Sequence, residues 1–112
     1  LRILPYESAV GIIAASIRPQ YLQELRTISI ASKIPLLIQP KVLSDDYESY
    51  CRKVVNLRPD LILVNSYSMI IRDDILAASR LGGLNIHTAL LPHGRGCNPT
   101  QWAIIHHEYE TG

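Results

Sequence analysis

The sequence predicts one α/β domain, a mostly parallel sheet with helices on both of its faces. Short apolar runs rich in β-branched residues alternate along the chain with segments whose apolar residues recur at helical spacing. Such alternation is typical of parallel strands joined by helices. The chain has 112 residues, 47% of them hydrophobic and 19% charged, which suits a single domain with a buried core.

Prolines mark the first predicted strand–helix–strand unit. Residues 9–15 are small and β-branched, as expected for a strand buried on both faces. Pro19 suits the first turn of a helix, because that turn tolerates a missing N–H. Pro35 ends this helix, and the apolar run at 36–38 forms the next strand, which Pro40 closes.

The second helix is predicted to begin at Ser44, whose hydroxyl can cap it. The carboxylates of Asp45 and Asp46 favour the positive end of the same helix. Apolar residues then recur at i, i+3, i+4, i+7 and i+8 and give one face for burial: Tyr47, Tyr50, Cys51, Val54 and Val55. The helix is expected to end before the turn at 58–60.

The rest of the chain continues the alternation. The apolar run at 61–66 is the third predicted strand, and a short helix over 73–80 follows it. The pair Gly82–Gly83 breaks that helix, and the next strand covers 84–88. A final helix is predicted over 99–107.

Asn85 and His87 lie at the end of a predicted strand, where ligands collect in open parallel sheets. Because side chains two residues apart project to the same side of a strand, the amide and the imidazole are expected to share one side of that crevice. The amide can donate to an oxygen that gains negative charge in a tetrahedral intermediate. The imidazole can move a proton near neutral pH. Together they suit acyl transfer, although an Asn and a His at a strand end also occur as purely structural hydrogen-bonding groups.

Charge and cysteine content narrow the classes of partner. Eleven basic residues against ten acidic ones give a net charge of +1, so direct contact with nucleic acid is not expected for this segment. Cys51 and Cys97 form no C-x-x-C pair, which disfavours a zinc knuckle or a redox dithiol and favours a reducing cytoplasm. No run of 18 apolar residues predicts a membrane span, and the composition leaves a homo-oligomer open.

A resemblance to folate-dependent formyltransferases is carried by residues 85–104, NIHTALLPHGRGCNPTQWAI, and by Glu-Thr-Gly at 110–112. That family includes methionyl-tRNA formyltransferase, glycinamide ribonucleotide formyltransferase and the amino-sugar N-formyltransferases. Upstream, the stretches at 34–40, 58–67 and 81–87 fall in the family's order and spacing. The resemblance covers nearly the whole chain.

The resemblance implies a Rossmann-like domain that binds 10-formyltetrahydrofolate as co-substrate and passes its formyl group to a primary amine. Carried over by position, Asn85 resembles the family's oxyanion-stabilising Asn, and His87 resembles its catalytic His. The segment that resembles the lining of the pterin pocket comprises Ser68, Met69, Ile70 and Ile71. The loop that looks like the one on the acceptor side contains Gly94, Arg95 and Gly96.

Three departures from the family pattern bear on activity. The family's catalytic Asp lies in a strand after the Glu-Thr-Gly, and its first strand has no counterpart before Leu1. The small hydroxyl residue usually found two positions after the His is Ala89 here. Residues 1–112 are therefore expected to be an internal portion of a formyltransferase catalytic domain that is inactive on its own.

The predicted acceptor is the primary amine of a nucleotide-linked amino sugar, because Trp102 resembles the sugar-type formyltransferases and no basic patch is present. Methionyl-tRNA is the alternative acceptor. The missing Asp leaves a non-catalytic binding module as a further alternative. A metal hydrolase is disfavoured, and no metal is expected, since the spacing of the four histidines matches no zinc pattern: His87, His93, His106 and His107.

Overall fold

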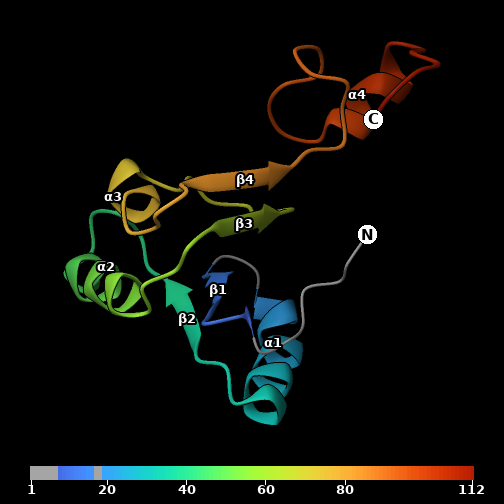
Figure 1. The fold of residues 1–112 in the computed structure, drawn as a ribbon. Coiled ribbons are helices and arrows are strands. Elements are labelled where there is room, and N and C mark those ends of the chain that lie inside the picture. Colours follow the sequence, from blue (N-terminus) through green and yellow to red (C-terminus); the bar gives the residue numbers. More distant parts are fainter. Residues whose placement is uncertain (1–7, 17–18) are drawn as a thin grey trace.

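The computed structural model describes residues 8–16 and 19–112, in which strands and helices alternate as the sequence predicts (Figure 1). In chain order the elements are β1 (Ile12–Ala15), α1 (Pro19–Ser32), β2 (Leu36–Gln39), α2 (Asp46–Asn56), β3 (Ile62–Asn65), α3 (Asp73–Leu76), β4 (Gly83–Ile86) and α4 (Pro99–Ile105). The predicted α/β class is confirmed.

All pairings between the described strands are parallel. β1 pairs with β2 from Ile12 opposite Leu36 onward, and β3 pairs with β4 from Ile62 opposite Gly83 onward. Within the described residues these are two two-stranded sheets, so the predicted single sheet is present here as two parallel pairs. Each pair is joined by a helical crossover, as parallel strands require.

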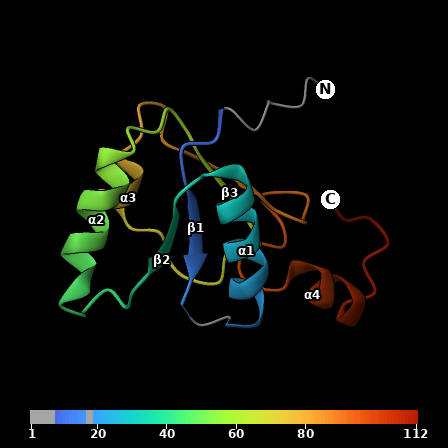
Figure 2. The same cartoon turned by 90° about the horizontal axis from the view of Figure 1, so that it is seen from below.

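One apolar core joins the two strand pairs. Its buried residues come from α2 and α3: Tyr47, Tyr50, Val54 and Ile75. They pack against Ile13 of β1, Leu37 of β2 and Ile62 of β3. Helix α1 contacts β1 and β2, and Figure 2 shows it on the opposite side of these strands from α2 and α3. The predicted helices on both faces are thus present at β1 and β2.

Two predicted strand boundaries are wrong by a few residues. The first strand begins at Ile12 rather than at residue 9, because its partner ladder starts after Pro35, which has no N–H to extend it. The carbonyl of Pro35 accepts a hydrogen bond from Ile12 N at 2.8 Å. The fourth strand ends at Ile86, so His87 lies just beyond it.

Three predictions about helix ends are also wrong. The Ser44 hydroxyl donates to the Lys41 carbonyl at 2.7 Å, and Asp45 occupies the N-cap of α2 without a side-chain cap. α3 stops at Leu76 instead of residue 80, because the Ser79 hydroxyl lies 2.9 and 2.7 Å from the carbonyls of Leu76 and Gly82 and closes a turn there. α4 ends before His107, whose φ of 55° does not continue a helix.

The C-terminal residues form a unit that stands apart from the strand pairs. Figure 1 shows α4 and the loop before it at a distance from the rest of the chain, joined through the segment after β4. In α4 the buried residue is Ala103. Across the described part of the chain, no helix has both the length and the apolar character needed to span a membrane.

Candidate functional site

A cavity of about 330 Å³ lies beside β3 and β4, where the sequence places the polar strand ends. Its volume falls near the lower end of the range of about 300–1,000 Å³ that is usual for ligand pockets. The lining residues are Val64, Tyr67, Met69, Ile71, Leu76, Gly83 and Asn85. The cavity is therefore mostly apolar, with one amide and one phenol.

The pairing of β3 with β4 explains why these side chains meet. Val64 lies opposite Asn85 and Ile62 opposite Gly83, and partners in a parallel ladder project to the same side. Gly83 leaves room for the Leu76 side chain in the cavity wall, because a Cβ at position 83 would approach Cδ2 of Leu76 to 2.8 Å. The register thus brings the Asn85 amide into an apolar recess.

The predicted donor-binding segment, residues 68–71, contributes two of its four side chains to the cavity. Met69 and Ile71 line it, whereas the Ile70 side chain is 81% exposed. The Ser68 hydroxyl is buried and has no hydrogen-bond partner among the described residues. Ile70 takes part through its backbone carbonyl, which accepts a hydrogen bond from Gln39.

His87 is anchored to the loop that follows it. Its Nε2 lies 2.9 Å from the carbonyl oxygen of Gly94. A carbonyl can only accept, so in the neutral ring Nε2 carries the proton and Nδ1 is the basic nitrogen. The Gly94 carbonyl thus fixes the tautomer, a role for which the local sequence offered no candidate. The structure places Asn85 in the cavity wall and His87 at the start of the neighbouring loop.

The three predicted acceptor-side residues lie in an exposed loop. Gly94 and Gly96 have φ values of 62° and 106°, which favour glycine. At Gly94 a Cβ would also lie 2.8 Å from that of Ala89. Arg95 between them is exposed, and no ion pair to it occurs among the described residues.

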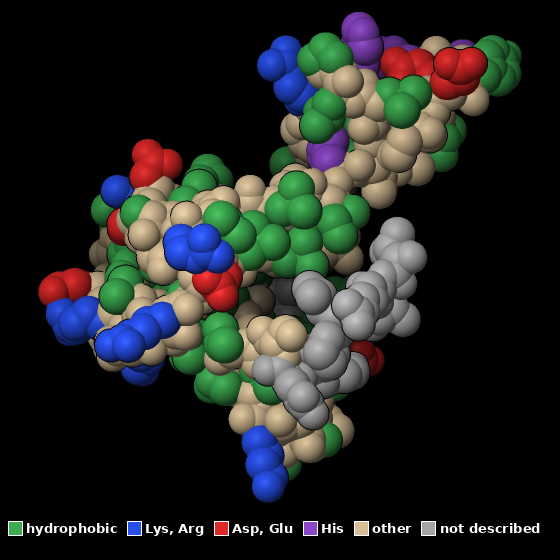
Figure 3. All heavy atoms as spheres, in the orientation of Figure 1, with side chains coloured by type: hydrophobic (Ala, Val, Ile, Leu, Met, Phe, Trp, Pro, Cys, Tyr) green, Lys and Arg blue, Asp and Glu red, His purple; other side chains and the backbone are tan. Residues whose placement is uncertain are grey.

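Beyond this loop, Trp102 of α4 stacks on His106, with ring centroids 5.7 Å apart and an interplanar angle of 20°. The Trp102 side chain is 54% exposed. Figure 3 shows histidines gathered on this C-terminal unit, while most Lys and Arg side chains lie elsewhere on the visible face. His93, His106 and His107 are exposed. The described residues contain no group of three side chains able to hold a metal ion.

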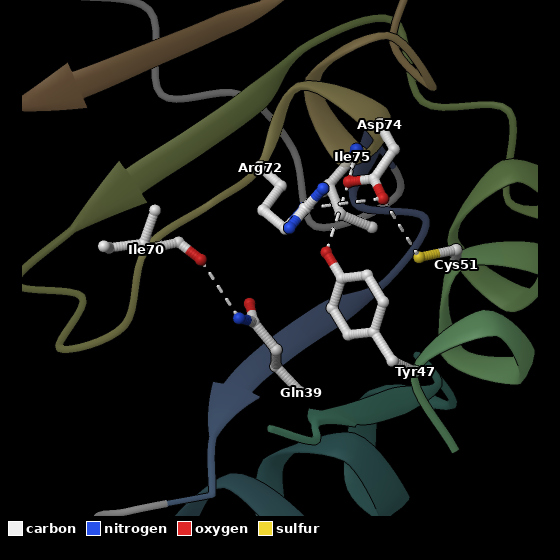
Figure 4. Close-up of polar contacts among 7 residues, drawn as sticks. All are labelled: Gln39, Tyr47, Cys51, Ile70, Arg72, Asp74 and Ile75. Carbon is white, nitrogen blue, oxygen red and sulfur yellow. Dashed lines mark hydrogen bonds and ion pairs between the residues drawn. The ribbon is translucent and has the colours of Figure 1, made fainter. Parts of the chain in front are cut away.

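A polar network behind the cavity was not predicted. The Tyr47 hydroxyl donates to Asp74 at 3.2 Å, and the Cys51 thiol lies 3.9 Å from the same carboxylate (Figure 4). Burial and this hydrogen bond raise the pKa of Tyr47 to about 12. Burial and the Asp74 charge likewise raise the pKa of the Cys51 thiol, so both groups stay protonated at neutral pH.

Sequence reasoning also missed Gln39, the last residue of β2. A polar residue near the end of an apolar run was the signal used for Asn85, and it applies equally to Gln39. Its amide is buried and hydrogen bonded to Tyr67, which precedes the donor-binding segment, and to Ile70 within that segment.

Comparison with known proteins relates the chain to formyltransferases. Residues 8–112 match the model of the formyl transferase family. The chain is 35% identical over 89 residues to a methionyl-tRNA formyltransferase of Thermodesulfovibrio yellowstonii, an alignment that covers 80% of this chain and 28% of the relative. It is 40% identical over 77 residues to a methionyl-tRNA formyltransferase of Enterococcus faecalis, with coverages of 69% and 24%.

A third relative carries a different name. The chain is 34% identical over 92 residues to the bifunctional polymyxin resistance protein ArnA of Wigglesworthia glossinidia brevipalpis, which covers 82% of this chain and 14% of the relative. The chain therefore spans roughly a quarter of the length of the first two relatives and less of the third.

Proposed function

The chain belongs to the formyl transferase family, and we propose that the protein containing it transfers a formyl group from 10-formyltetrahydrofolate to a primary amine. The observation that carries this proposal is the apolar cavity beside β3 and β4, which has the Asn85 amide in its wall. Two of its lining residues, Val64 and Asn85, lie near the carboxyl ends of β3 and β4, and open α/β sheets bind ligands just outside such ends.

The cavity fits the flat end of the donor. Met69, Ile71 and Val64 offer apolar surface to a bicyclic pterin ring. The ring edge carries hydrogen-bonding groups, and the buried Ser68 hydroxyl has no hydrogen-bond partner in the part of the chain that the structure describes. A buried polar group without a partner is costly, and a bound ligand is one means of satisfying it.

The proposed reaction joins the amine nitrogen to the formyl carbon and breaks the bond from that carbon to N10 of the folate. In the tetrahedral intermediate the formyl oxygen becomes negative, and the Asn85 amide donates a hydrogen bond to it. His87 accepts the proton of the attacking amine at Nδ1, since Nε2–H donates to Gly94. The proton that His87 takes from the amine passes to N10 as the bond from carbon to N10 breaks, so tetrahydrofolate leaves protonated on N10 and the acceptor keeps the formyl group.

For the acceptor we propose a nucleotide-linked amino sugar. The exposed Trp102 ring offers a flat apolar surface beside the loop that carries Arg95. Residues 87–112 contain one Lys or Arg, Arg95, against Glu108 and Glu110, which suits a small substrate better than a polyanion.

Methionyl-tRNA is the second candidate acceptor. It is favoured by the names of the relatives from T. yellowstonii and E. faecalis. Since the chain spans a minor part of those proteins, a surface for tRNA phosphates could be supplied by the remainder of the protein.

The test uses the full protein that contains this chain. Release of tetrahydrofolate from 10-formyltetrahydrofolate is measured with nucleotide-linked amino sugars and with methionyl-tRNA as acceptors, for the wild type and for Asn85→Ala. Formyl transfer that falls about 10²–10³-fold in Asn85→Ala supports the proposed site. Folate binding without transfer to either acceptor class would instead show a non-catalytic module. Transfer that is unaffected by Asn85→Ala would show that the chemistry lies elsewhere.

A further inference from the structure

Gln39 is the most conspicuous polar residue in the interior of the molecule. It closes β2, it is 1% exposed, and both polar atoms of its amide are hydrogen bonded. Nε2 donates to the carbonyl of Ile70 at 3.1 Å, and Oε1 accepts from the Tyr67 hydroxyl at 2.8 Å. Figure 4 shows the amide directed at the Ile70 carbonyl.

One partner of Gln39, Tyr67, directly precedes the donor-binding segment, and the other, Ile70, belongs to it. Tyr67 and Ile70 enclose Ser68 and Met69, and both Tyr67 and Met69 line the cavity. Gln39 belongs to the strand pair β1–β2, whereas this segment follows β3 of the other pair. One side chain therefore ties the donor-binding segment to a strand with which it shares no ladder.

Residues 67–71 have little else to hold their backbone. In the part of the chain that the structure describes, they make no backbone–backbone hydrogen bond. The bond from Gln39 is the side-chain hydrogen bond that reaches their backbone. Burial raises the pKa of Tyr67 to about 12, so at neutral pH its hydroxyl is a donor and keeps the Gln39 oxygen on its side.

We propose that Gln39 is a positioning residue of the donor site, which holds residues 67–70 in the conformation that shapes the cavity and so sets the affinity for the folate donor. This inference rests on the proposed function. Gln39 acts through Tyr67 and Ile70 and does not itself line the cavity. Its loss should therefore weaken donor binding far more than the chemical step or acceptor binding.

Three substitutions in the full protein separate the two hydrogen bonds. Gln39→Glu keeps the size and the acceptor oxygen for Tyr67 but, when ionised, has no donor for Ile70. Gln39→Leu removes both bonds, and Tyr67→Phe removes the phenol hydroxyl alone. For each variant, calorimetry gives the Kd of a non-reactive folate analogue, and steady-state kinetics give kcat and the KM of donor and acceptor.

Ser29→Ala is the matched control. The Ser29 hydroxyl donates to the Ile34 carbonyl at 2.6 Å in a half-buried position between α1 and β2, remote in sequence from the donor-binding segment. This variant also loses a side-chain bond to a backbone carbonyl, so its free energy of unfolding should fall. Its KM for the donor should match that of the wild type.

The Gln39 variants should raise the donor KM and the analogue Kd about tenfold or more, and Tyr67→Phe about threefold, with acceptor KM and kcat within about twofold of the wild type. Should Gln39→Leu not fold, Gln39→Glu and Tyr67→Phe carry the same test. Gln39 and Tyr67 variants that bind the donor as Ser29→Ala does would overturn the inference. A wild type that neither binds the analogue nor transfers formyl would overturn the proposed function and, with it, this inference.

Discussion

The donor side and the acceptor side of the proposed site are held in different ways. Residues 67–71 rest against the core and are tied to β2 by the buried Gln39 amide. Residues 88–112 form a unit in which Trp102, Ile104 and Ile105 of α4 are largely exposed. The hydrogen bond between His87, just after β4, and the Gly94 carbonyl joins this unit to the end of the strand.

This difference indicates where the stability of the fold and the activity of the site depend on the same residues. On the donor side, the packing that stabilises the fold also shapes the cavity, so a core substitution should affect both. On the acceptor side, side chains can change without loss of buried surface, so their effects should be confined to kinetics. His87 stands at the junction and connects the two regions.

The largest expected effect therefore lies at the junction. His87→Ala in the full protein should lower kcat about 10²–10³-fold or more, because it removes the proposed proton acceptor. His93→Ala, an exposed imidazole on the acceptor loop, is the control and should retain the wild-type rate. Steady-state assays with saturating donor check both variants. Equal rates for His87→Ala and the wild type would remove His87 from the mechanism.

The second-largest effect is expected from a substitution in the core, which should destabilise the donor side. Ile75 is 2% exposed and packs with Val54 and the two tyrosines of α2. Ile75→Ala should lower the free energy of unfolding by about 2–5 kcal/mol, as other buried Ile-to-Ala changes do. Ile104→Ala removes the same atoms from a side chain that is 70% exposed, and should change stability by less than about 0.5 kcal/mol. Urea denaturation measures the free energy of unfolding of both variants. Equal losses of stability in Ile75→Ala and Ile104→Ala would contradict the difference between the donor side and the acceptor side.

The elements whose signals are local were predictable from the sequence. Apolar runs gave the strands, Pro19 gave the start of α1, and the helical spacing of Tyr47, Tyr50 and Val54 gave the buried face of α2. Asn85 was singled out near the end of β4 and lines the cavity, whereas His87 is not among the lining residues. These features depend on neighbours within a few residues, and that information is contained in any short window.

Contacts between distant residues were not predictable in this way. Gln39 binds Ile70, 31 positions away, and a sequence window around either residue gives no sign of the pairing. The Gly94 carbonyl that orients His87 was also missed, because any backbone carbonyl can accept and its position depends on the loop. Ser44 failed as a cap for a local reason instead, since its hydroxyl donates to the Lys41 carbonyl three residues earlier.

A smaller difference between the donor side and the acceptor side is expected in how the free energy of unfolding depends on pH. Burial raises the pKa of Tyr67 from 10.0 to about 12, so its contribution to stability is full below pH 10 and is lost as pH rises through about 12. The free energy of unfolding should therefore fall across that interval, and Tyr67→Phe should make the fall shallower. Tyr109→Phe, at an exposed position of the acceptor side, should show the same fall in the free energy of unfolding with pH as the wild type. Urea titrations between pH 9 and pH 12 test this, and equal slopes for Tyr67→Phe and the wild type would contradict it.

The smallest expected effect lies at Trp102, far from the core. Trp102→Ala removes the 54% exposed ring that is proposed to contact the acceptor, and an aromatic contact with a ligand contributes about 0.5–1.5 kcal/mol. We therefore expect the acceptor KM to rise about three- to tenfold, while the donor KM and the free energy of unfolding stay near their wild-type values. Ile105→Ala, an exposed apolar side chain on the same helix, should change none of the three. If Trp102→Ala instead lowers stability or donor affinity, the C-terminal unit packs against the donor side in solution, and the two regions are coupled after all.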